Sequence, residues 1–265
     1  MGRYAPRMLR LAAGDVALTL DPARGGRIIS LVISGRELIV WERMRTIDWG
    51  SYPMAPFAGR LRDGTFEFHG RTYRLPATEG PNAIHGTTLE QAWTTVDDAT
   101  IVAELADPWP FRGRVTQQFE LGPDRLDATM TLEADEPMPA VLGWHPWFIR
   151  RIDGVEAELE FRARGMYERG PDGLPTGRLI EPSPLPWDDC FTDVTAGPTV
   201  RWPGILELTL ESDASHWVVY TGDRDGLAIE PQTGPPDGPN LDPHVVVPGT
   251  PLTLHMTWRW RRLDG

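Results

Sequence analysis

The sequence predicts an all-β protein that folds as a large antiparallel β-sandwich. Short apolar or alternating runs recur along the chain, at the spacing of about 8–12 residues that is typical of sandwiches and barrels. The chain contains 27 glycines and 26 prolines, which supply the turns between these runs, whereas helical periodicity is almost absent. No window resembles a flexible linker or an internal repeat, so residues 1–265 are expected to form a single β-sandwich domain.

The predicted strands follow one another with short turns between most of them. In chain order they are residues 16–20, 26–33, 37–40, 65–68, 71–75, 92–97, 100–105, 112–121, 125–134, 139–144, 157–160, 199–202, 206–212, 217–221, 227–230 and 252–259. Residues 65–75 and 112–134 each read as a hairpin, because a tight turn separates their two runs. The acidic, proline-rich segment 170–189 is predicted to be a long connection, which is either a functional loop or a plain surface loop.

Composition excludes several classes of function. The net charge of −12 argues against a nucleic-acid or anionic-membrane partner and favours a neutral substrate. The sequence has no lysine, which excludes Schiff-base and pyridoxal-phosphate enzymes and phosphate-loop nucleotide binding. Its one cysteine, Cys190, allows no intrachain disulfide and fits a buried thiol better than a nucleophile. Because no apolar run reaches the ~18 residues of a membrane span, we expect a cytoplasmic protein, as a monomer or homodimer.

A single carboxylate stands where an apolar run meets a rigid loop. Residues 227–229 are apolar and Glu230 follows them. Pro231 is expected to end this strand, because proline has no backbone donor. A side chain in this place is well positioned to face a binding pocket, and a turn carboxylate that is merely hydrated is the alternative.

Two histidines have unusual surroundings. His85 precedes Gly86, which lets the backbone turn directly after it, although a histidine in this setting is more often structural. His145 ends an apolar run between two tryptophans, one of which is Trp147. Desolvation by indole rings lowers the pKa of a histidine and suits it to proton exchange near neutral pH. The 11 tryptophans also favour a carbohydrate ligand, because their faces stack on sugar C–H groups, with core packing as the alternative for most of them.

The remaining candidates are polar residues in or beside loops. Arg60 follows an apolar run and Gly59, so it needs either a structural carboxylate or a ligand as its partner. Its planar guanidinium group can donate hydrogen bonds to two neighbouring hydroxyl oxygens. Asp188 has a second carboxylate next to it, and adjacent side chains of an extended chain point to opposite faces. Asn82 lies three residues before His85. No spacing of histidines or carboxylates indicates a metal site, and no cofactor is expected.

These motifs, in this order, resemble the aldose 1-epimerase (galactose mutarotase) family. The motifs similar to the family's are Gly25-Gly-Arg-Ile28, Asn82-Ala-Ile-His-Gly86, Gly143-Trp-His-Pro-Trp-Phe148, Asp188-Asp-Cys-Phe191 and Gly226–Asn240. In the last motif, Glu230, Gln232, Pro236, Asp237 and Asn240 are all in register with the family pattern. The resemblance implies a galactose mutarotase-like sandwich with its site in a cleft on one face.

The resemblance also implies a reaction that interconverts the α and β anomers of a free aldose. It assigns Glu230 as base, His145 as acid and His85 as an assisting donor near the ring oxygen. It assigns substrate hydroxyls to Arg60 and Asp188, and the further candidates for substrate binding are Asn82, Gln232 and Trp147. A monosaccharide is then the partner, and neither metal nor cofactor is needed.

Two departures from the family pattern leave the sugar open. Gly59 replaces an asparagine, and Ile149 stands where another asparagine often follows the phenylalanine. The alternatives to a free-aldose mutarotase are a hexose-6-phosphate mutarotase, in which Arg60, Arg62 or Arg112 would hold the phosphate, and a non-catalytic sugar-binding or sensing protein. A glycosidase would need two carboxylates around one bond, for example Glu230 and Asp188, and would leave the histidines unexplained.

Overall fold

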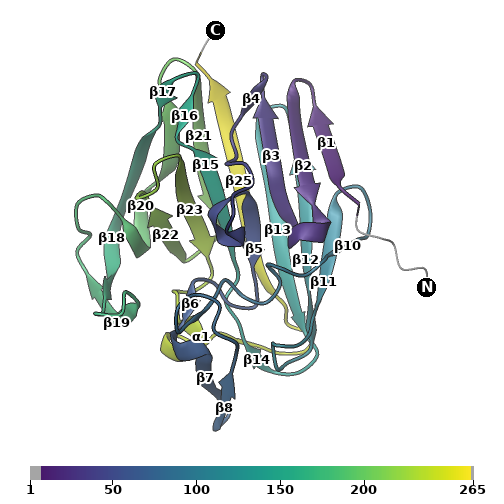
Figure 1. The fold of residues 1–265 in the computed structure, drawn as a ribbon, viewed down its shortest axis with the longest axis vertical. Helices are drawn as coiled ribbons and strands as arrows, with labels where there is room; N and C mark the ends of the chain where they lie inside the picture. The colour runs from purple at the N-terminus through teal and green to yellow at the C-terminus, as the bar shows by residue number, and fades with distance from the viewer. Residues whose placement is uncertain (1–6, 264–265) are drawn as a thin grey trace.

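The computed structural model describes residues 7–263, and nearly all of its regular structure is β. Most strands belong to one 17-stranded sheet that curls back on itself into a sandwich (Figure 1). Every ladder between these strands is antiparallel. The prediction of a large antiparallel β-sandwich is therefore confirmed.

One hydrogen-bonded path runs through the whole sheet. It begins with β1 (Leu9–Ala13), β2 (Val16–Asp21), β3 (Arg27–Ile33), β5 (Ser51–Met54) and β15 (Gly143–Ile149). It continues through β23 (Gly226–Gln232), β22 (His216–Tyr220), β20 (Asp188–Trp202), β21 (Leu206–Ser212) and β25 (Leu252–Arg262). It ends with β13 (Arg125–Ala134), β12 (Gly113–Leu121), β11 (Thr100–Leu105) and β10 (Thr94–Thr95).

Shorter elements complete the chain. Beside the main path lie β4 (Arg36–Glu37), β18 (Glu158–Arg169) and β19 (Pro175–Ile180). Small separate pairs are formed by β6 (Arg60–Leu61) with β9 (Ala83–Ile84), β7 (Thr65–Phe68) with β8 (Arg71–Arg74), β14 (Met138–Pro139) with β24 (Val245–Val246), and β16 (Arg151–Ile152) with β17 (Val155–Glu156). The helices are short: η1 (Pro22–Arg24), η2 (Thr46–Asp48), η3 (Arg62–Gly64) and α1 (Gly238–Leu241).

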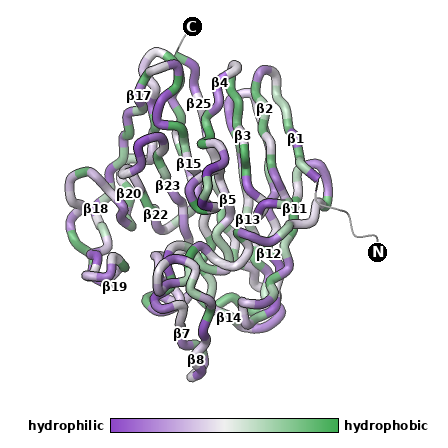
Figure 2. Tube along the Cα trace, in the orientation of Figure 1, coloured by the Kyte–Doolittle hydropathy of each residue, from purple (hydrophilic) through white to green (hydrophobic). Residues whose placement is uncertain are grey.

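Alternation of side chains places the core between the two layers. In β12 and β13 buried residues alternate with more exposed ones, as expected for strands with one face in the core. Fully buried core residues include Val115 of β12, Met130 of β13, Leu208 of β21 and Trp258 of β25. Figure 2 shows the resulting mixture of hydrophobic and hydrophilic residues along the strands. The two predicted hairpins form, as β7–β8 and β12–β13.

The long connection predicted over residues 170–189 is interrupted by a strand and ends earlier than expected. β18 continues to Arg169, β19 returns as its hairpin partner, and β20 already begins at Asp188. Tertiary pairing with β18 on one side and with β22 and β21 on the other holds β20 extended despite its polar sequence. Asp188 therefore stands at the start of a paired strand and not in a loop.

Pro231 does not end its strand, which corrects a second prediction. β23 runs on to Gln232, and Pro231 lies opposite Trp217 of β22. On its other side β23 pairs with β15 only at the ends of their contact, at Gly143 with Gln232 and from Trp147 with Ala228 onwards. Pro146 and Pro231 both lie in the interrupted part, and neither has an N–H to contribute to a ladder. The result is a local gap between two strands that remain side by side.

Candidate active site

His145 and Glu230 face each other across the gap between β15 and β23. The ladder pairs on either side of the gap, Gly143 with Gln232 and Trp147 with Ala228, put His145 opposite Glu230 in the antiparallel register. The Nε2 atom of His145 lies 3.2 Å from Oε1 of Glu230. The other carboxylate oxygen, Oε2, accepts a hydrogen bond of 3.1 Å from Nε2 of Gln232. Two strands thus hold an acid–base pair within proton-transfer distance.

Burial sets the protonation of this pair. Glu230 is 3 % exposed and His145 is 6 % exposed. Desolvation raises the pKa of Glu230 well above its usual value, and the nearby charge of Asp188 raises it further. Desolvation also lowers the pKa of His145 to about 3. The free site therefore favours a protonated carboxyl beside a neutral imidazole.

Aromatic rings fix the orientation of His145. Its imidazole stacks on Tyr52 with 4.8 Å between ring centroids and on Trp147 with 5.3 Å. His85 meets it edge to face at 5.0 Å. These contacts come from β5, β15 and the turn after β9, so three separate segments hold one imidazole ring.

The turn that carries His85 has a constrained backbone. His85 has a φ of 57°, in the left-handed region that non-glycine residues seldom adopt. Its N–H donates to the carbonyl oxygen of Gly59 at 2.9 Å. Gly86 follows with a φ of 81°, and a Cβ atom there would lie 2.0 Å from the carbonyl oxygen of Ala55. The turn therefore needs glycine at position 86 and aims the imidazole into the cleft.

A buried carboxylate braces the turn that presents Arg60. Asp237 is 2 % exposed, and its N–H donates to the carbonyl oxygen of Arg60 at 2.8 Å. Its carboxylate accepts from the backbone N–H of Arg62 at 3.1 Å and from the side chain of Asn240 at 2.8 Å. The guanidinium of Arg60 lines the cleft and forms no ion pair with any carboxylate in residues 7–263. Arg60 is thus available to a ligand, while Arg62 is engaged with Asp172 and Asp237.

Asp188 enters the cleft with a partner that the sequence did not suggest. Arg169, from the end of β18, lies 3.6 Å from the carboxylate of Asp188 and 2.9 Å from that of Asp189. Asp189 is buried, so Arg169 bridges an inner and an outer carboxylate. Arg169 itself lines the cleft, as does the neighbouring Tyr167. No local pattern marks either residue, because the pairing of β18 with β20 brings them to the site.

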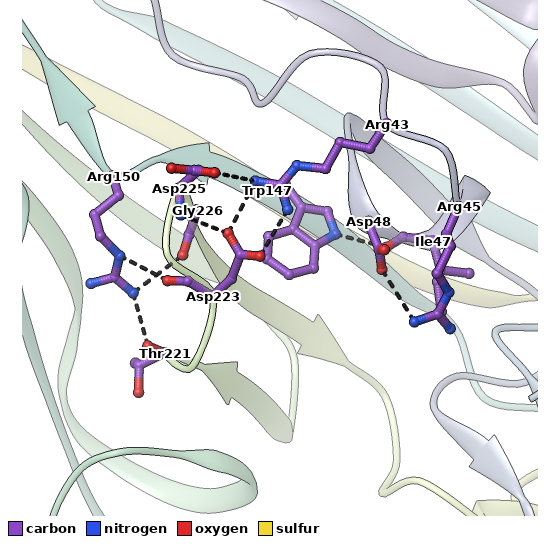
Figure 3. A network of polar contacts seen from close by, with 10 residues as sticks. All are labelled: Arg43, Arg45, Ile47, Asp48, Trp147, Arg150, Thr221, Asp223, Asp225 and Gly226. Atoms are coloured by element: carbon purple, nitrogen blue, oxygen red, sulfur yellow. Dashed lines mark hydrogen bonds and ion pairs between the residues drawn. The ribbon is translucent and has the colours of Figure 1, made fainter.

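Trp147 forms another wall, held in place by a network of polar contacts (Figure 3). Its indole Nε1 donates to the carbonyl oxygen of Ile47 at 2.8 Å, and the guanidinium of Arg43 lies 5.7 Å from its ring centroid. Arg43 in turn makes two hydrogen bonds with Asp223, of 2.8 and 3.0 Å. Sequence reasoning missed this segment: Arg45, Ile47 and Asp48 all line the cleft, although nothing in residues 41–48 sets them apart from an ordinary loop.

The cleft has a volume of about 310 Å³. Six of the predicted site residues line it: Glu230, His145, His85, Arg60, Asp188 and Trp147. Gln232 is fully buried behind Glu230 and reaches only its carboxylate. Asn82 does not line the cleft, because its side-chain oxygen accepts the backbone N–H of Asp63 at 3.0 Å and so stabilises the turn beside Arg60. In this structure Asn82 is thus placed to support the turn beside Arg60.

The two departures from the family pattern differ in their position. Gly59 lines the cleft with a φ of 68°, and a Cβ atom there would lie 2.5 Å from Cβ of Pro236. A side chain at this position therefore requires the loop after β23 to move. Ile149 lies outside the cleft and packs against the core, so its identity bears on packing more than on ligand contacts.

The lining of the cleft contains more acidic than basic side chains. Arg45, Arg60 and Arg169 line it, against the six carboxyl groups of Asp48, Glu79, Asp188, Asp189, Asp223 and Glu230. Most of these carboxylates pair with arginines, including Arg43 just outside the lining. Among residues 7–263, no group of three His, Cys, Asp or Glu side chains is arranged to hold a metal ion. Nor does any helix in that range have the length and apolarity needed to cross a membrane.

Comparison with solved structures finds the same fold. A protein of Escherichia coli K12 provisionally assigned as an aldose 1-epimerase superposes with a TM-score of 0.84 at 22 % identity, covering 98 % of this chain and 100 % of that one. A galactose mutarotase-like protein of Clostridium acetobutylicum superposes with a TM-score of 0.84 at 19 % identity, covering 97 % of this chain and 96 % of that one. A galactose 1-epimerase of Lactobacillus acidophilus superposes with a TM-score of 0.80 at 16 % identity, covering 98 % of both chains.

Comparison of sequences gives one partial match to a curated protein and one match to a family model. The uncharacterised protein YphB of Escherichia coli K12 is 32 % identical over 108 residues, which cover 38 % of this chain and 37 % of YphB. The match therefore spans little more than a third of the curated relative. The sequence model described as aldose 1-epimerase matches residues 22–259, which include every cleft residue named above. The chain belongs to the aldose 1-epimerase family.

Proposed function

We propose that this protein is an aldose 1-epimerase that interconverts the α and β anomers of a free, unphosphorylated aldose. The observation that carries the proposal is the contact of 3.2 Å between His145 Nε2 and Glu230 Oε1, buried at the floor of the cleft. Anomer exchange needs one group that removes the proton of the anomeric hydroxyl and another that protonates the ring oxygen. A carboxylate and an imidazole that together hold one proton supply both.

Glu230 acts as the base and His145 as the acid in this proposal. In the reactive form Glu230 is ionised and His145 carries the proton. Glu230 then takes the proton of the O1 hydroxyl while the C1–O1 bond becomes a carbonyl. The C1–O5 bond breaks and O5 receives the proton of His145. The open chain rotates about C1–C2 and closes on the other face of the carbonyl by the reverse transfers.

The burial of the pair favours the ring-opened state. After ring opening Glu230 is protonated and His145 is neutral, which is the arrangement that desolvation stabilises in the free site. Forming the ionised pair from the free site costs free energy, and the site recovers this free energy as the ring opens. That cost is part of the barrier measured from the free site, so acceleration must come from contacts that strengthen in the transition state.

The other cleft residues have positioning roles in this proposal. His85, whose pKa is lowered well below its usual value by desolvation, is a neutral hydrogen-bond donor towards the ring oxygen. Arg60 and the pair of Asp188 with Arg169 hold hydroxyl groups, and Trp147 offers a wall for the C–H face of the ring. Gln232 orients the carboxylate of Glu230. The monosaccharide substrate needs no cofactor.

An unphosphorylated sugar fits the charges better than a hexose 6-phosphate. Of the arginines considered for a phosphate, Arg62 is paired with two carboxylates and Arg112 lies outside the cleft. Arg60 is the one of these three that lines the cleft without an ion pair among the described residues, so a phosphate would find a single unpaired arginine there. The other arginines of the lining, Arg45 and Arg169, already pair with carboxylates, which lie where a phosphate would have to bind.

The test is the rate of mutarotation of freshly dissolved α-glucose and α-galactose, followed by polarimetry. Glu230→Gln and His145→Ala are each expected to reduce the enzymatic rate by at least ~10²-fold while the fold persists, since one positioned acid or base contributes about 10²–10⁴-fold. Glu211→Gln, an exposed substitution on β21, is the matched control. Wild-type rates in either site variant would refute the assignment. Sugar binding without any acceleration by the wild-type protein would identify a binding or sensing protein, and a preference for glucose 6-phosphate would identify the phosphorylated substrate.

A further inference from the structure

Tyr167 lies at the end of the cleft floor that is remote from the acid–base pair. Residues at paired register positions of adjacent strands point to the same face of a sheet. The register of β18 with β20 places Tyr167 opposite Cys190, Cys190 pairs with Val218 of β22, and Val218 pairs with Glu230 of β23. All four residues line the cleft. Three strand spacings of about 4.8 Å separate Tyr167 from Glu230, so its phenol is placed for a hydroxyl remote from C1.

A chain of hydrogen bonds leads from Tyr167 away from the cleft. The phenolic oxygen lies 3.2 Å from Nε2 of His216, on β22. The Nδ1 atom of the same imidazole lies 2.8 Å from Oγ of Ser215. The hydroxyl group of Ser215 in turn donates to the carbonyl oxygen of Thr233 at 3.0 Å. The chain therefore ends on a backbone group that can only accept.

This end point fixes the direction of every bond in the chain. Ser215 has one hydroxyl hydrogen and donates it to Thr233, so its Oγ accepts from Nδ1 of His216. A neutral imidazole carries a single N–H, which is then at Nδ1. Nε2 is left as an acceptor, and the hydrogen of the Tyr167 hydroxyl points to it. For a neutral imidazole, no other arrangement satisfies all three contacts.

Burial keeps both rings in the neutral state that this direction requires. His216 is 8 % exposed, and desolvation lowers its pKa, although the charge of Asp242 opposes this effect. Desolvation also raises the pKa of the Tyr167 phenol, which therefore keeps its hydrogen near neutral pH. Within residues 7–263 the phenolic oxygen makes no hydrogen bond except that to His216. Its lone pairs thus remain for a ligand in the cleft.

We propose that Tyr167 accepts a hydrogen bond from a substrate hydroxyl remote from C1 and so selects sugars that carry a free hydroxyl at that position. The inference rests on the proposed function and adds a specificity-determining residue to it. Beside Tyr167 the charged groups of Arg169, Asp188 and Asp189 are already paired with one another, whereas the phenol is an uncharged acceptor without a donor. The alternative is a purely structural role, in which Tyr167 only joins β18 to β22.

Fluorinated sugars separate these two roles, because fluorine is close in size to a hydroxyl group but donates no hydrogen bond. The parent sugar is glucose or galactose, whichever the wild-type protein mutarotates faster. Its kinetics are compared with those of analogues in which fluorine replaces each single hydroxyl other than O1, in the wild type and in Tyr167→Phe. Tyr73→Phe, which changes a half-buried tyrosine of β8 outside the cleft, is the control. Circular dichroism and thermal unfolding establish that each variant folds.

We expect Tyr167→Phe to raise the KM for the parent sugar roughly 3- to 10-fold with little change in kcat, as for the loss of one neutral hydrogen bond made equally in the ground and transition states. For one fluoro analogue the wild type and Tyr167→Phe should have equal KM values, because that analogue has already lost the bond. An increase in KM that is the same for every sugar would identify the structural role and overturn the inference. So would an unchanged KM for the parent sugar.

Ser215→Ala provides the same test if Tyr167→Phe does not fold. It leaves the phenol in the cleft but frees His216 to adopt the other tautomer, so the hydrogen of Tyr167 is no longer directed away from the ligand. The KM should again rise for the parent sugar and stay equal to that of the wild type for one fluoro analogue. An effect that does not depend on the sugar would overturn the inference here too.

If the wild-type protein accelerates neither glucose nor galactose, the proposed function fails by itself. Calorimetry with the same sugars then decides the inference. It stands if a parent sugar binds and Tyr167→Phe weakens that binding but not the binding of one fluoro analogue. It falls if neither parent sugar binds, or if the substitution weakens the binding of every sugar equally or of none.

Discussion

The Nε2 atom of His145 and the Oε1 atom of Glu230 lie 3.2 Å apart at opposed register positions of β15 and β23. Each strand also carries a proline in this region, Pro146 or Pro231, so the backbone ladder is open where the two side chains meet. The same interruption that removes hydrogen bonds from the sheet thus makes room for an acid–base pair. The pH dependence of the protein should reflect this arrangement.

The mutarotation rate should depend on the single proton that Glu230 and His145 share. Because the pKa of Glu230 is raised and that of His145 is lowered to about 3, the one-proton form persists from about pH 3 up to the raised pKa of the carboxyl group. We expect kcat/KM to fall on the alkaline side as this proton is lost, and to fall on the acid side only when His145 gains a second proton. Polarimetry over a range of pH, corrected for buffer catalysis, measures both limbs. An activity that rises steadily with alkalinity would contradict the one-proton form.

The buried histidine should also make folding sensitive to acid. The folded-state pKa of His145 lies below its unfolded value, so the unfolded chain takes up a proton that the folded site refuses as the pH falls below about 6.5. This histidine alone should lower the free energy of unfolding by ~1.4 kcal/mol per pH unit between about pH 6.5 and 3. Glu230 acts in the opposite direction, because its raised pKa makes the folded state the better proton acceptor.

Urea unfolding at several pH values tests this linkage through a difference between proteins. The stability difference between wild type and His145→Gln should shrink as the pH falls below about 6.5, since the variant lacks the group that resists protonation. His69→Gln removes a histidine from an exposed turn and is the matched control. A difference that stays constant over the acid range would show that burial does not depress the titration of His145.

Sequence patterns located much of this site because the motif residues sit where strands begin, end or are interrupted. The turn that glycine permits after His85 and the apolar run before Glu230 marked both residues as candidates, and the family resemblance assigned their roles. Arg169, Arg45 and Asp48 were not recognisable, since they reach the cleft only through the pairing of β18 with β20 and the path of residues 41–48. Tertiary contacts of this kind leave no local periodicity.

The same reason explains the errors in the fold. β12, β13 and β25 alternate cleanly because each has one face in the core, and their runs were predicted. β18 and β20 are long, polar and irregular in register, so only short alternating pieces of them, residues 157–160 and 199–202, read as strands. Pro231 was read as a strand terminator, although it is tolerated where the ladder to β15 is already open.

Arg27→Met should loosen the segment that forms one wall of the cleft. Arg27 is 0 % exposed and donates to the carbonyl oxygens of Arg24, Thr46 and Trp49 at 2.9, 2.9 and 3.1 Å. Its guanidinium also lies 4.1 Å from the ring centroid of Trp49. Methionine keeps much of the volume but leaves these carbonyl groups without their donor, at a cost of about 1–3 kcal/mol for each buried one.

We therefore expect Arg27→Met to lower the free energy of unfolding by roughly 2–5 kcal/mol and to raise the KM for glucose more than it lowers kcat. Loss of the nearby positive charge should also raise the pKa of His145, because that charge opposes protonation of the imidazole. Arg24→Met, which changes a half-exposed neighbour, is the control. Urea unfolding and polarimetric kinetics measure both effects, and a variant with wild-type stability and KM would contradict this role of Arg27.

Gly59→Asn, which restores the asparagine of the family pattern, should destabilise this protein. Asparagine tolerates a φ of 68° better than most residues, so the backbone is not the main obstacle. The obstacle is Pro236, whose Cβ and Cγ atoms would lie 2.5 and 2.8 Å from the new Cβ. Overpacking of this kind typically costs about 1–3 kcal/mol. Gly59→Asn should cost less stability in a Pro236→Gly background than in the wild-type protein, because the colliding ring is then absent. A double-mutant cycle by urea unfolding gives the coupling energy, and additive effects would show that contact with Pro236 is not what keeps glycine at position 59.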